Sequence, residues 1–312
     1  MAYPGTKRSY GAWLKSSYPQ LKYYPTVIDP FFGGGGLSSA WIDAFGKPER
    51  LIVAESFTPL RNLYKEPPTD GELLGWGQMF LDLIDYKSLD WDSLSEEWSD
   101  IGGIIKDGPG FFDSRKIRCI AEVWGDLRSG LNNGCRRSYC TLQGLGAGNS
   151  MRHGNRGHNI APDPAKIVGL AKRVNPIKPD AKYSGLISPV CPVEVDNVYV
   201  HWQSAIEHAE NPSEAVCLID PPYVGGERIY PNEDALGCAG PPVELACKRG
   251  FAAIVAFNYY SIELDCLFRT VALAHGYAIE AKETEFTSKC NQRENRKADK
   301  AEYCWVLTRK NK

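Results

Sequence analysis

The sequence predicts an α/β fold, because short apolar runs typical of buried strands alternate with segments typical of helices. Residues Thr26–Ile28 lead through a glycine-rich turn into a helix that we expect to end near Phe45. Arg50–Ala54 and Val216–Ile219 are two further apolar runs, and each is followed directly by an acidic residue. Since these runs are predicted strands, the acidic residues after them lie at strand ends and are candidates for binding or catalysis.

Three more strands and one helix are predicted in the C-terminal third. A helix is expected to begin near Trp202, directly after one of these strands. The strands are predicted over Asn197–Val200, Ala253–Asn258 and Ala301–Leu307.

Length and composition fit one large globular domain or a core with one insertion. The chain has 312 residues, and 43% of them are hydrophobic, which is enough for a sizeable core. The net charge is −2. Total charge therefore gives no support for nucleic-acid binding, and any support must come from how the charge is distributed.

Composition also favours a cytoplasmic protein with no membrane partner. The first residues lack the apolar core of a signal peptide, and no segment approaches about 18 consecutive apolar residues. The ten cysteines include no Cys-x-x-Cys pair. We expect reduced thiols and no metal site.

The turn after the first strand is rich in glycine. It reads Asp29-Pro30-Phe31-Phe32 followed by four consecutive glycines, Gly33 among them. A strand, a glycine-rich turn and a helix N-terminus together form a cradle for a nucleotide-like ligand.

An acidic residue, Glu55, ends the next strand about twenty residues later, where doubly wound folds use an acid to bind ribose hydroxyls. This pair of features fits NAD as well as S-adenosylmethionine. The run of glycines lacks the spacing Gly-x-Gly-x-x-Gly, which disfavours NAD.

The most informative stretch is Asp220-Pro221-Pro222-Tyr223, at the end of a predicted strand. The prolines restrict the backbone and remove two N–H donors, which leaves the carbonyls of Asp220 and Pro221 beside a carboxylate. Two acceptors next to an aromatic ring suit a planar base that carries an exocyclic amine. A turn opened by Asp-Pro is the structural alternative.

Asp-Pro-Pro-Tyr resembles the signature of amino-directed DNA methyltransferases, above all those that act on adenine. Dam-type enzymes begin with an aromatic-x-Gly-x-Lys motif, which Tyr3, Gly5 and Lys7 match. They continue with acid-Pro-Phe-x-Gly-x-Gly on a strand, which residues 29–35 match. The motifs also follow the family's order, with the cofactor motifs before the catalytic one.

This resemblance covers nearly the whole chain and implies its architecture. It predicts a Rossmann-like S-adenosylmethionine-dependent methyltransferase fold with a mixed seven-stranded sheet and an inserted target-recognition region. Residues 1–65 and 191–312 are predicted to form the catalytic methyltransferase domain. Residues 66–190 are predicted to form the inserted helical and basic region.

The resemblance also implies the reaction and its site. Site-specific transfer of a methyl group from S-adenosylmethionine to N6 of a flipped-out adenine in double-stranded DNA is expected, with no metal. The implied catalytic residues are Asp220, Pro221, Pro222 and Tyr223. The implied cofactor-binding residues are Tyr3, Pro4, Gly5, Lys7, Asp29, Pro30, Phe31, Gly33, Gly35, Glu55, Ser56 and Asp220. Family members often place further cofactor contacts where residues 199–202 lie, and they line the base pocket where Asn258 lies; Asn258 could equally cap the next helix.

The central segment divides by charge. From Asp70 to Asp100 there are nine acidic residues and one basic residue, whereas from Asp113 to Lys182 there are thirteen basic and five acidic residues. The basic part is the expected DNA face. The predicted DNA-binding residues are Arg136, Arg137, Arg152, Arg156, Asn159, Lys289 and Arg293.

Residues 149–162 resemble the recognition segment of the Dam family and also depart from it. Arg152, Gly157 and Pro162 match at strict spacing. Asn159 stands where the family has Phe, and no Gly-Arg-Tyr follows Pro162. The family's GATC target is therefore not transferred to this chain.

Three other functions stay open: cytosine-N4 methylation of DNA, methylation of RNA or of a protein amide, and DNA binding by the same fold without turnover. A monomer is the family expectation. A separate restriction endonuclease is a possible partner, and the compartment expected is the cytoplasm, in association with the nucleoid or in a phage-infected cell.

Overall fold

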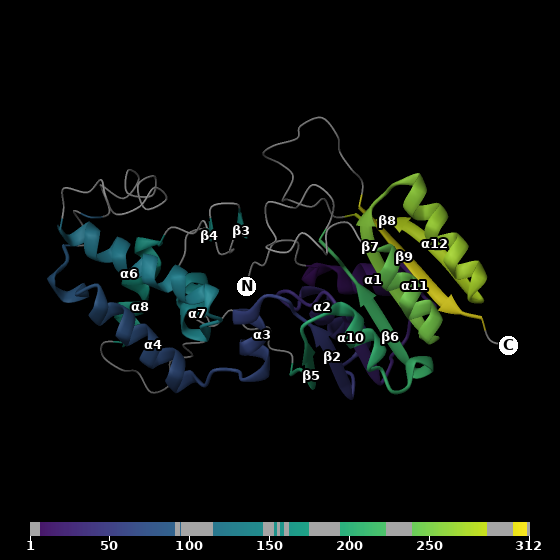
Figure 1. The fold of residues 1–312 in the computed structure, drawn as a ribbon, viewed down its shortest axis with the longest axis horizontal. Helices are drawn as coiled ribbons and strands as arrows, with labels where there is room; N and C mark the ends of the chain where they lie inside the picture. The colour runs from purple at the N-terminus through teal and green to yellow at the C-terminus, as the bar shows by residue number, and fades with distance from the viewer. Residues whose placement is uncertain are drawn as a thin grey trace. The chain divides into compact units, whose positions relative to one another are not determined.

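The structure is a computed structural model, shown in Figure 1, and it describes nine stretches of the chain. These are residues 7–90, 94, 115–145, 153–154, 157–158, 162–174, 194–222, 239–285 and 302–310. The chain divides into two compact units, one containing residues 57–190 and the other containing residues 4–56 and 191–312. We call them the helical unit and the sheet unit. The division falls at Phe57, whereas the predicted insertion begins at residue 66.

The sheet unit is built on one mixed sheet of seven strands, in the order β5-β2-β1-β6-β7-β9-β8. The first five strands in this order pair in parallel, and β9 runs antiparallel to both of its neighbours. The predicted α/β fold with a mixed seven-stranded sheet is therefore confirmed. The strands are β1 (Thr26–Asp29), β2 (Arg50–Ala54), β5 (Asn197–Tyr199), β6 (Ala215–Ile219), β7 (Ala253–Tyr259), β8 (Tyr277–Glu283) and β9 (Glu302–Arg309).

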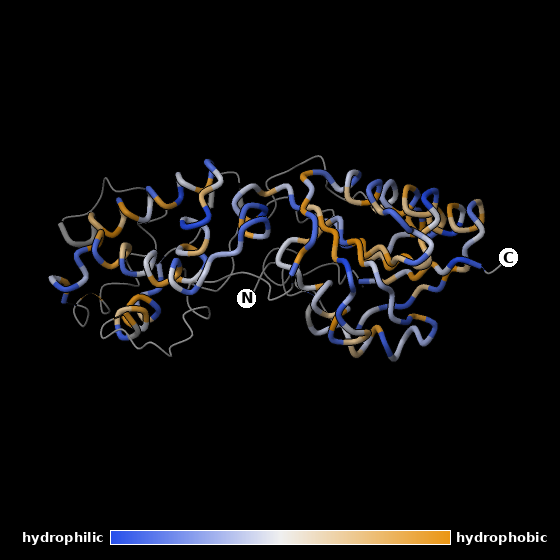
Figure 2. Tube along the Cα trace, turned by 90° about the horizontal axis from the view of Figure 1, so that it is seen from below, coloured by the Kyte–Doolittle hydropathy of each residue, from blue (hydrophilic) through white to orange (hydrophobic). Residues whose placement is uncertain are grey.

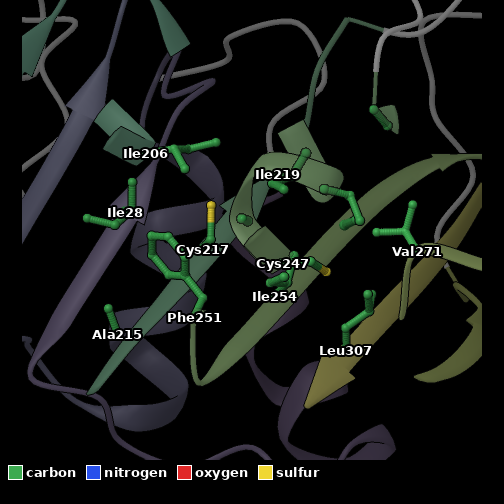
Figure 3. Close-up of a cluster of buried hydrophobic side chains, with 14 of the residues drawn as sticks. Ile28, Ile206, Ala215, Cys217, Ile219, Cys247, Phe251, Ile254, Val271 and Leu307 are labelled. Atoms are coloured by element: carbon green, nitrogen blue, oxygen red, sulfur yellow. The ribbon is translucent and has the colours of Figure 1, made fainter. Parts of the chain in front are cut away.

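One face of this sheet packs on three helices through a continuous apolar core (Figure 3). The helices are α10 (Trp202–Glu207), α11 (Gly240–Arg249) and α12 (Ile262–Ala274). Ile28, Cys217 and Ile254 project from β1, β6 and β7 into this core and are fully buried. Apolar residues are concentrated along the central strands of the sheet (Figure 2), as expected for parallel strands covered on both faces.

The opposite face is covered by η1 (Arg8–Tyr10), α1 (Gly11–Ser17) and α2 (Gly36–Phe45). Tyr18, which follows α1, donates from its hydroxyl to the Cys304 carbonyl of β9 at 2.6 Å. Gly11 lets α1 approach α2 closely, because a Cβ at this position would lie 2.4 Å from the Ala40 carbonyl oxygen. Any larger residue at Gly11 would push the two helices apart.

The order of the strands reverses between β1 and β6. From β1 the chain moves outward through β2 to β5, whereas from β6 it moves the other way to β7. The loops that leave the carboxyl ends of β1 and β6 therefore diverge, and ligands of open α/β sheets bind in the crevice between such loops. The segments after Asp29 and Ile219 lie at this switch point.

The helical unit, taken by itself, packs helices on helices. Phe80 of α4 meets Trp124 of α6 edge to face, with ring centroids 6.1 Å apart. Thr69 and Glu72 form a reciprocal capping box at the start of α4, an arrangement that satisfies two backbone donors. The helices are α3 (Thr58–Lys65), α4 (Asp70–Leu83), η2 (Tyr86–Ser88), α6 (Arg115–Asn132), α7 (Arg136–Leu145) and α8 (Pro164–Val174), with a short hairpin of β3 (His153–Gly154) and β4 (Gly157–His158).

A search of the described residues for membrane spans found no helix with the length and apolarity needed to cross a bilayer.

Candidate functional site

Strand alternation points Asp29 and Asp220 to the same side of the sheet. Side chains of a strand alternate between its two faces. Ile28 of β1 and Ile219 of β6 belong to the core beneath α10, α11 and α12. The adjacent residues Asp29 and Asp220 therefore face the other side, where η1, α1 and α2 pack.

Asp29 organises the turn that follows β1. Its Oδ2 accepts from the Ser38 hydroxyl at 2.6 Å, and its Oδ1 accepts from the Phe31 backbone N–H at 3.3 Å. Gly33 and Gly35 have φ values of 50° and 68°, a left-handed conformation that side-chain-bearing residues rarely adopt. The carboxyl group of Asp29 therefore holds this turn by hydrogen bonds, and α2 begins where the turn ends.

Burial raises the pKa of Asp29 to about 7. The Ser38 hydrogen bond works against this rise, whereas the negative charges of Asp220 and Glu55 add to it. The three carboxyl groups therefore affect one another, as expected for acids collected at one edge of a sheet.

This shift predicts a specific pH dependence of stability. Asp29 holds its proton more tightly in the folded protein than in the unfolded chain, so its contribution to stability is fully present below its ordinary pKa of 3.8 and is lost as the pH rises through about 7. The free energy of unfolding of the wild type should fall between about pH 5 and about pH 8. In Asp29→Asn this fall should be smaller by roughly 2–3 kcal/mol. Urea unfolding of both proteins at the two pH values measures this.

The control for this prediction is Asp43→Asn, the same change at an exposed position of α2. It should leave the pH dependence of unfolding as it is in the wild type. If the wild type and Asp29→Asn lose stability in parallel across this pH range, the assignment of the titration to Asp29 is wrong.

Lys7 joins two strand ends on this side of the sheet. Its Nζ lies 3.2 Å from Asp220 Oδ1 and 3.0 Å from Glu302 Oε1, and the lysine is 4% exposed. The ammonium also lies 5.4 Å from the ring centroids of Tyr10 and of Phe257. The side chain of Asp220 is 17% exposed. A ligand can therefore contact its carboxylate while Lys7 remains paired with Oδ1.

The other predicted cofactor residues surround the β1 and β2 strand ends. Glu55 is buried, 7% exposed, and its backbone N–H donates to the Tyr199 carbonyl at 3.0 Å. The rings of Phe31 and Trp202 stack, with centroids 6.4 Å apart. Among the remaining residues, Pro30 and Gly35 are buried, Gly33 is half-buried and Ser56 is exposed.

Asn258 at the end of β7 does not cap the following helix. Ser261 is the N-cap of α12, and its hydroxyl accepts from the Leu264 N–H at 3.1 Å. The alternative reading of Asn258 as a helix cap is therefore wrong. Its Nδ2 is buried and has no hydrogen-bond partner among the described residues.

Two of the predicted DNA-binding residues lie in the helical unit at the start of α7. Arg136 forms ion pairs with Glu66 at 3.2 Å and Glu72 at 3.5 Å. Arg137 donates to the Met79 sulfur at 2.7 Å. Arg136 is thus paired with two carboxylates of its own unit. Its contact with DNA stays a prediction.

Several predicted site residues lie outside the described residues. They are Tyr3, Pro4, Gly5, Tyr223, Arg152, Arg156, Asn159, Lys289 and Arg293.

Sequence reasoning missed Glu302 and Tyr10, both of which contact the site. The Tyr10 hydroxyl donates to Glu302 Oε2. The sequence carried a weak signal for each, because Tyr10 follows Lys7 at a helical spacing and Glu302 is an acid at the start of an apolar strand. Neither signal indicates that the two residues meet.

Comparison with known proteins gives no family for this chain: no family model matches it, and no curated protein matches it either. Within the described residues there is no group of three or more His, Cys, Asp or Glu side chains that could hold a metal ion.

Proposed function

We propose that this protein is a DNA adenine-N6 methyltransferase that uses S-adenosylmethionine. One observation carries the proposal. At the switch point of the sheet, Asp220-Pro221-Pro222 leaves β6 next to the strand that ends in Asp29 and its glycine turn. Crevices at this place in open α/β sheets bind nucleotide-like ligands, and an acid followed by two prolines suits an amine substrate better than a phosphate.

The residues around the switch point fit the proposed cofactor. Gly33 and Gly35 keep the turn free of side chains where a ligand approaches, and the N-terminus of α2 favours polar or negative groups. Buried Glu55 supplies a carboxylate that can accept from two ribose hydroxyls. When bound, S-adenosylmethionine supplies a methyl group activated on a sulfonium sulfur.

Asp220 and Pro221 bind and orient the amine of the target base. The carboxylate and the Pro221 carbonyl accept the two N–H protons, which turns the nitrogen lone pair away from the ring and toward the electrophile. Positive charge then develops on this nitrogen, and the carboxylate of Asp220 stabilises it. As the new N–C bond forms, the bond between the methyl group and sulfur would break, and the proton that leaves the nitrogen would pass to the Asp220 carboxylate that accepts it and from there to water.

The substrate must leave the DNA stack first. The exocyclic amine of adenine is inside the duplex, and extruding the base costs a few kcal/mol. The basic residues between Asp113 and Lys182 offer a charged surface for phosphates. This distribution favours double-stranded DNA over a small-molecule amine as the substrate.

The test is an incubation of the purified protein with tritiated S-adenosylmethionine and unmethylated genomic DNA. The DNA is then digested, and the labelled nucleoside is identified by chromatography and mass spectrometry. We expect label in N6-methyladenine, and mapping the label gives the target sequence. Label in N4-methylcytosine would replace adenine by cytosine, and absence of label with folded protein that binds both ligands would leave a DNA-binding function without turnover.

A further inference from the structure

Glu302 is a buried carboxylate that the chain holds from several sides. Its side chain is 2% exposed, and its Oε1 faces Lys7 Nζ at 3.0 Å. Its Oε2 accepts from the Tyr10 hydroxyl and from the Thr284 hydroxyl at 3.3 Å. The Thr284 backbone N–H also donates to the Glu302 carbonyl at 2.8 Å. The glutamate is therefore fixed in both its backbone and its side chain.

Lys7 connects Glu302 to Asp220, whose strands are not neighbours in the sheet. Glu302 pairs with Tyr259 of β7, and β7 lies between β9 and β6. Lys7 comes from the N-terminal segment and crosses this gap with one ammonium group. The three side chains thus link the N-terminal segment, the end of β6 and the start of β9.

Lys7 is held as a cation in this network. Burial works to lower the pKa of its ammonium, but Asp220 and Glu302 outweigh burial, and the pKa lies above its ordinary value of 10.5. Without Glu302 the buried ammonium would lose the carboxylate that lies 3.0 Å from it. It would then hold Asp220 less firmly in one orientation.

Stability alone is a poor reason for this arrangement. Buried ion pairs often contribute less net stability than apolar residues of the same volume, because removing charges from water is costly. In some proteins such pairs fix the geometry of the groups around them. The geometry fixed here is that of Asp220, the acid whose orientation toward an amine decides the proposed reaction.

We propose that Glu302, acting through Lys7, is a positioning residue that keeps the Asp220 carboxylate oriented toward the exocyclic amine of the target base. Tyr10 supports this role by holding Glu302. The inference rests on the proposed methyltransferase function. It adds to the site a residue of β9, a strand that the catalytic motif does not include.

The test compares Glu302→Gln with the wild type in single-turnover methyl transfer at saturating DNA and cofactor. We expect the rate to fall roughly 10–100-fold, because small misplacement of a reacting group has effects of this size. Dissociation constants for DNA and for S-adenosylmethionine should stay within about threefold, since uniform binding is not affected. The matched control is Glu280→Gln, the same change on the adjacent strand β8, where Glu280 is a half-buried partner of Lys282.

A pH profile separates positioning from general damage to the fold. Asp220 pairs with Lys7, which also pairs with Glu302, and the charge of Asp220 acts on Asp29 and Tyr10 as well. In Lys7→Met the acid limb of the rate profile should move to higher pH, because the carboxylate loses its cation. In Glu302→Gln it should move to lower pH, because a negative charge is lost. A merely structural defect lowers the rate without opposite shifts.

Tyr10→Phe keeps the test decisive if Glu302→Gln does not fold. This variant removes one donor to Glu302 and preserves the ring, and we expect a loss of about 3–10-fold. Unchanged rates in Glu302→Gln, or in Tyr10→Phe where Glu302→Gln does not fold, with an active wild type, would overturn this inference and leave the proposed function standing. No transfer by the wild type would overturn the proposed function and the inference together.

Discussion

Replacing Asp220 by Asn should reduce methyl transfer by roughly 10²–10⁴-fold, the range seen when one group that acts in the transition state is removed. The variant keeps the size of the side chain and loses its charge. Lys7 lies 3.2 Å from Oδ1, so the amide should turn its oxygen toward the ammonium. Its NH₂ group would then point toward the amine of the substrate, where a donor meets a donor.

The measurement is a single-turnover assay of label transferred to DNA, together with binding of DNA and of S-adenosylmethionine. Binding of both should remain within a few-fold, because the chemical step uses interactions that the ground state does not. Asp43→Asn is the control for the loss of one negative charge, since Asp43 lies exposed on α2. If Asp220→Asn kept more than about a tenth of the wild-type rate, Asp220 would not be the group that acts on the amine.

The strands of the sheet could be predicted where they are apolar along their whole length. Arg50–Ala54 was predicted with the observed bounds, and Thr26–Ile28 was predicted one residue short of β1. Strand β8 was not predicted from its residues, because Tyr277–Glu283 is an edge strand with mostly half-buried side chains. Its first three residues are apolar and three of its last four are charged, and an edge strand with one solvated face needs no continuous apolar run.

The candidate site could be predicted only in its local parts. Asp29 ends a strand and Glu55 and Asp220 each follow one, and parallel strands bring their carboxyl ends to one edge of a sheet. The contact between Tyr10 and Glu302 joins residues 292 positions apart. This contact depends on β9 lying between β7 and β8. The hydrophobic pattern of a sequence predicts where strands are but not the order in which they pair, so it could not predict the contact.

The core beneath the site gives the second large expected effect. Phe251 is fully buried and lies in the apolar cluster that joins the sheet to α10, α11 and α12 (Figure 3). Its carbonyl accepts from the Tyr277 hydroxyl at 2.6 Å and its N–H donates to the Ala246 carbonyl at 3.3 Å, so both of its backbone groups are bonded. Phe251→Ala should lower the free energy of unfolding by about 3–5 kcal/mol, from lost burial and from the cavity that remains.

The control is Leu273→Ala on α12, because Leu273 is 78% exposed. An exposed leucine contributes little, and its truncation should change stability by less than about 0.5 kcal/mol. Urea unfolding followed both by tryptophan fluorescence and by far-UV circular dichroism measures the two variants, and coincident curves establish a single transition. A loss below about 1 kcal/mol in Phe251→Ala would contradict the packing of α10, α11 and α12 on this face. Since Ile28 of β1 and Ile219 of β6 lie in this same core, that packing is also what turns Asp29 and Asp220 toward the face where Lys7 lies.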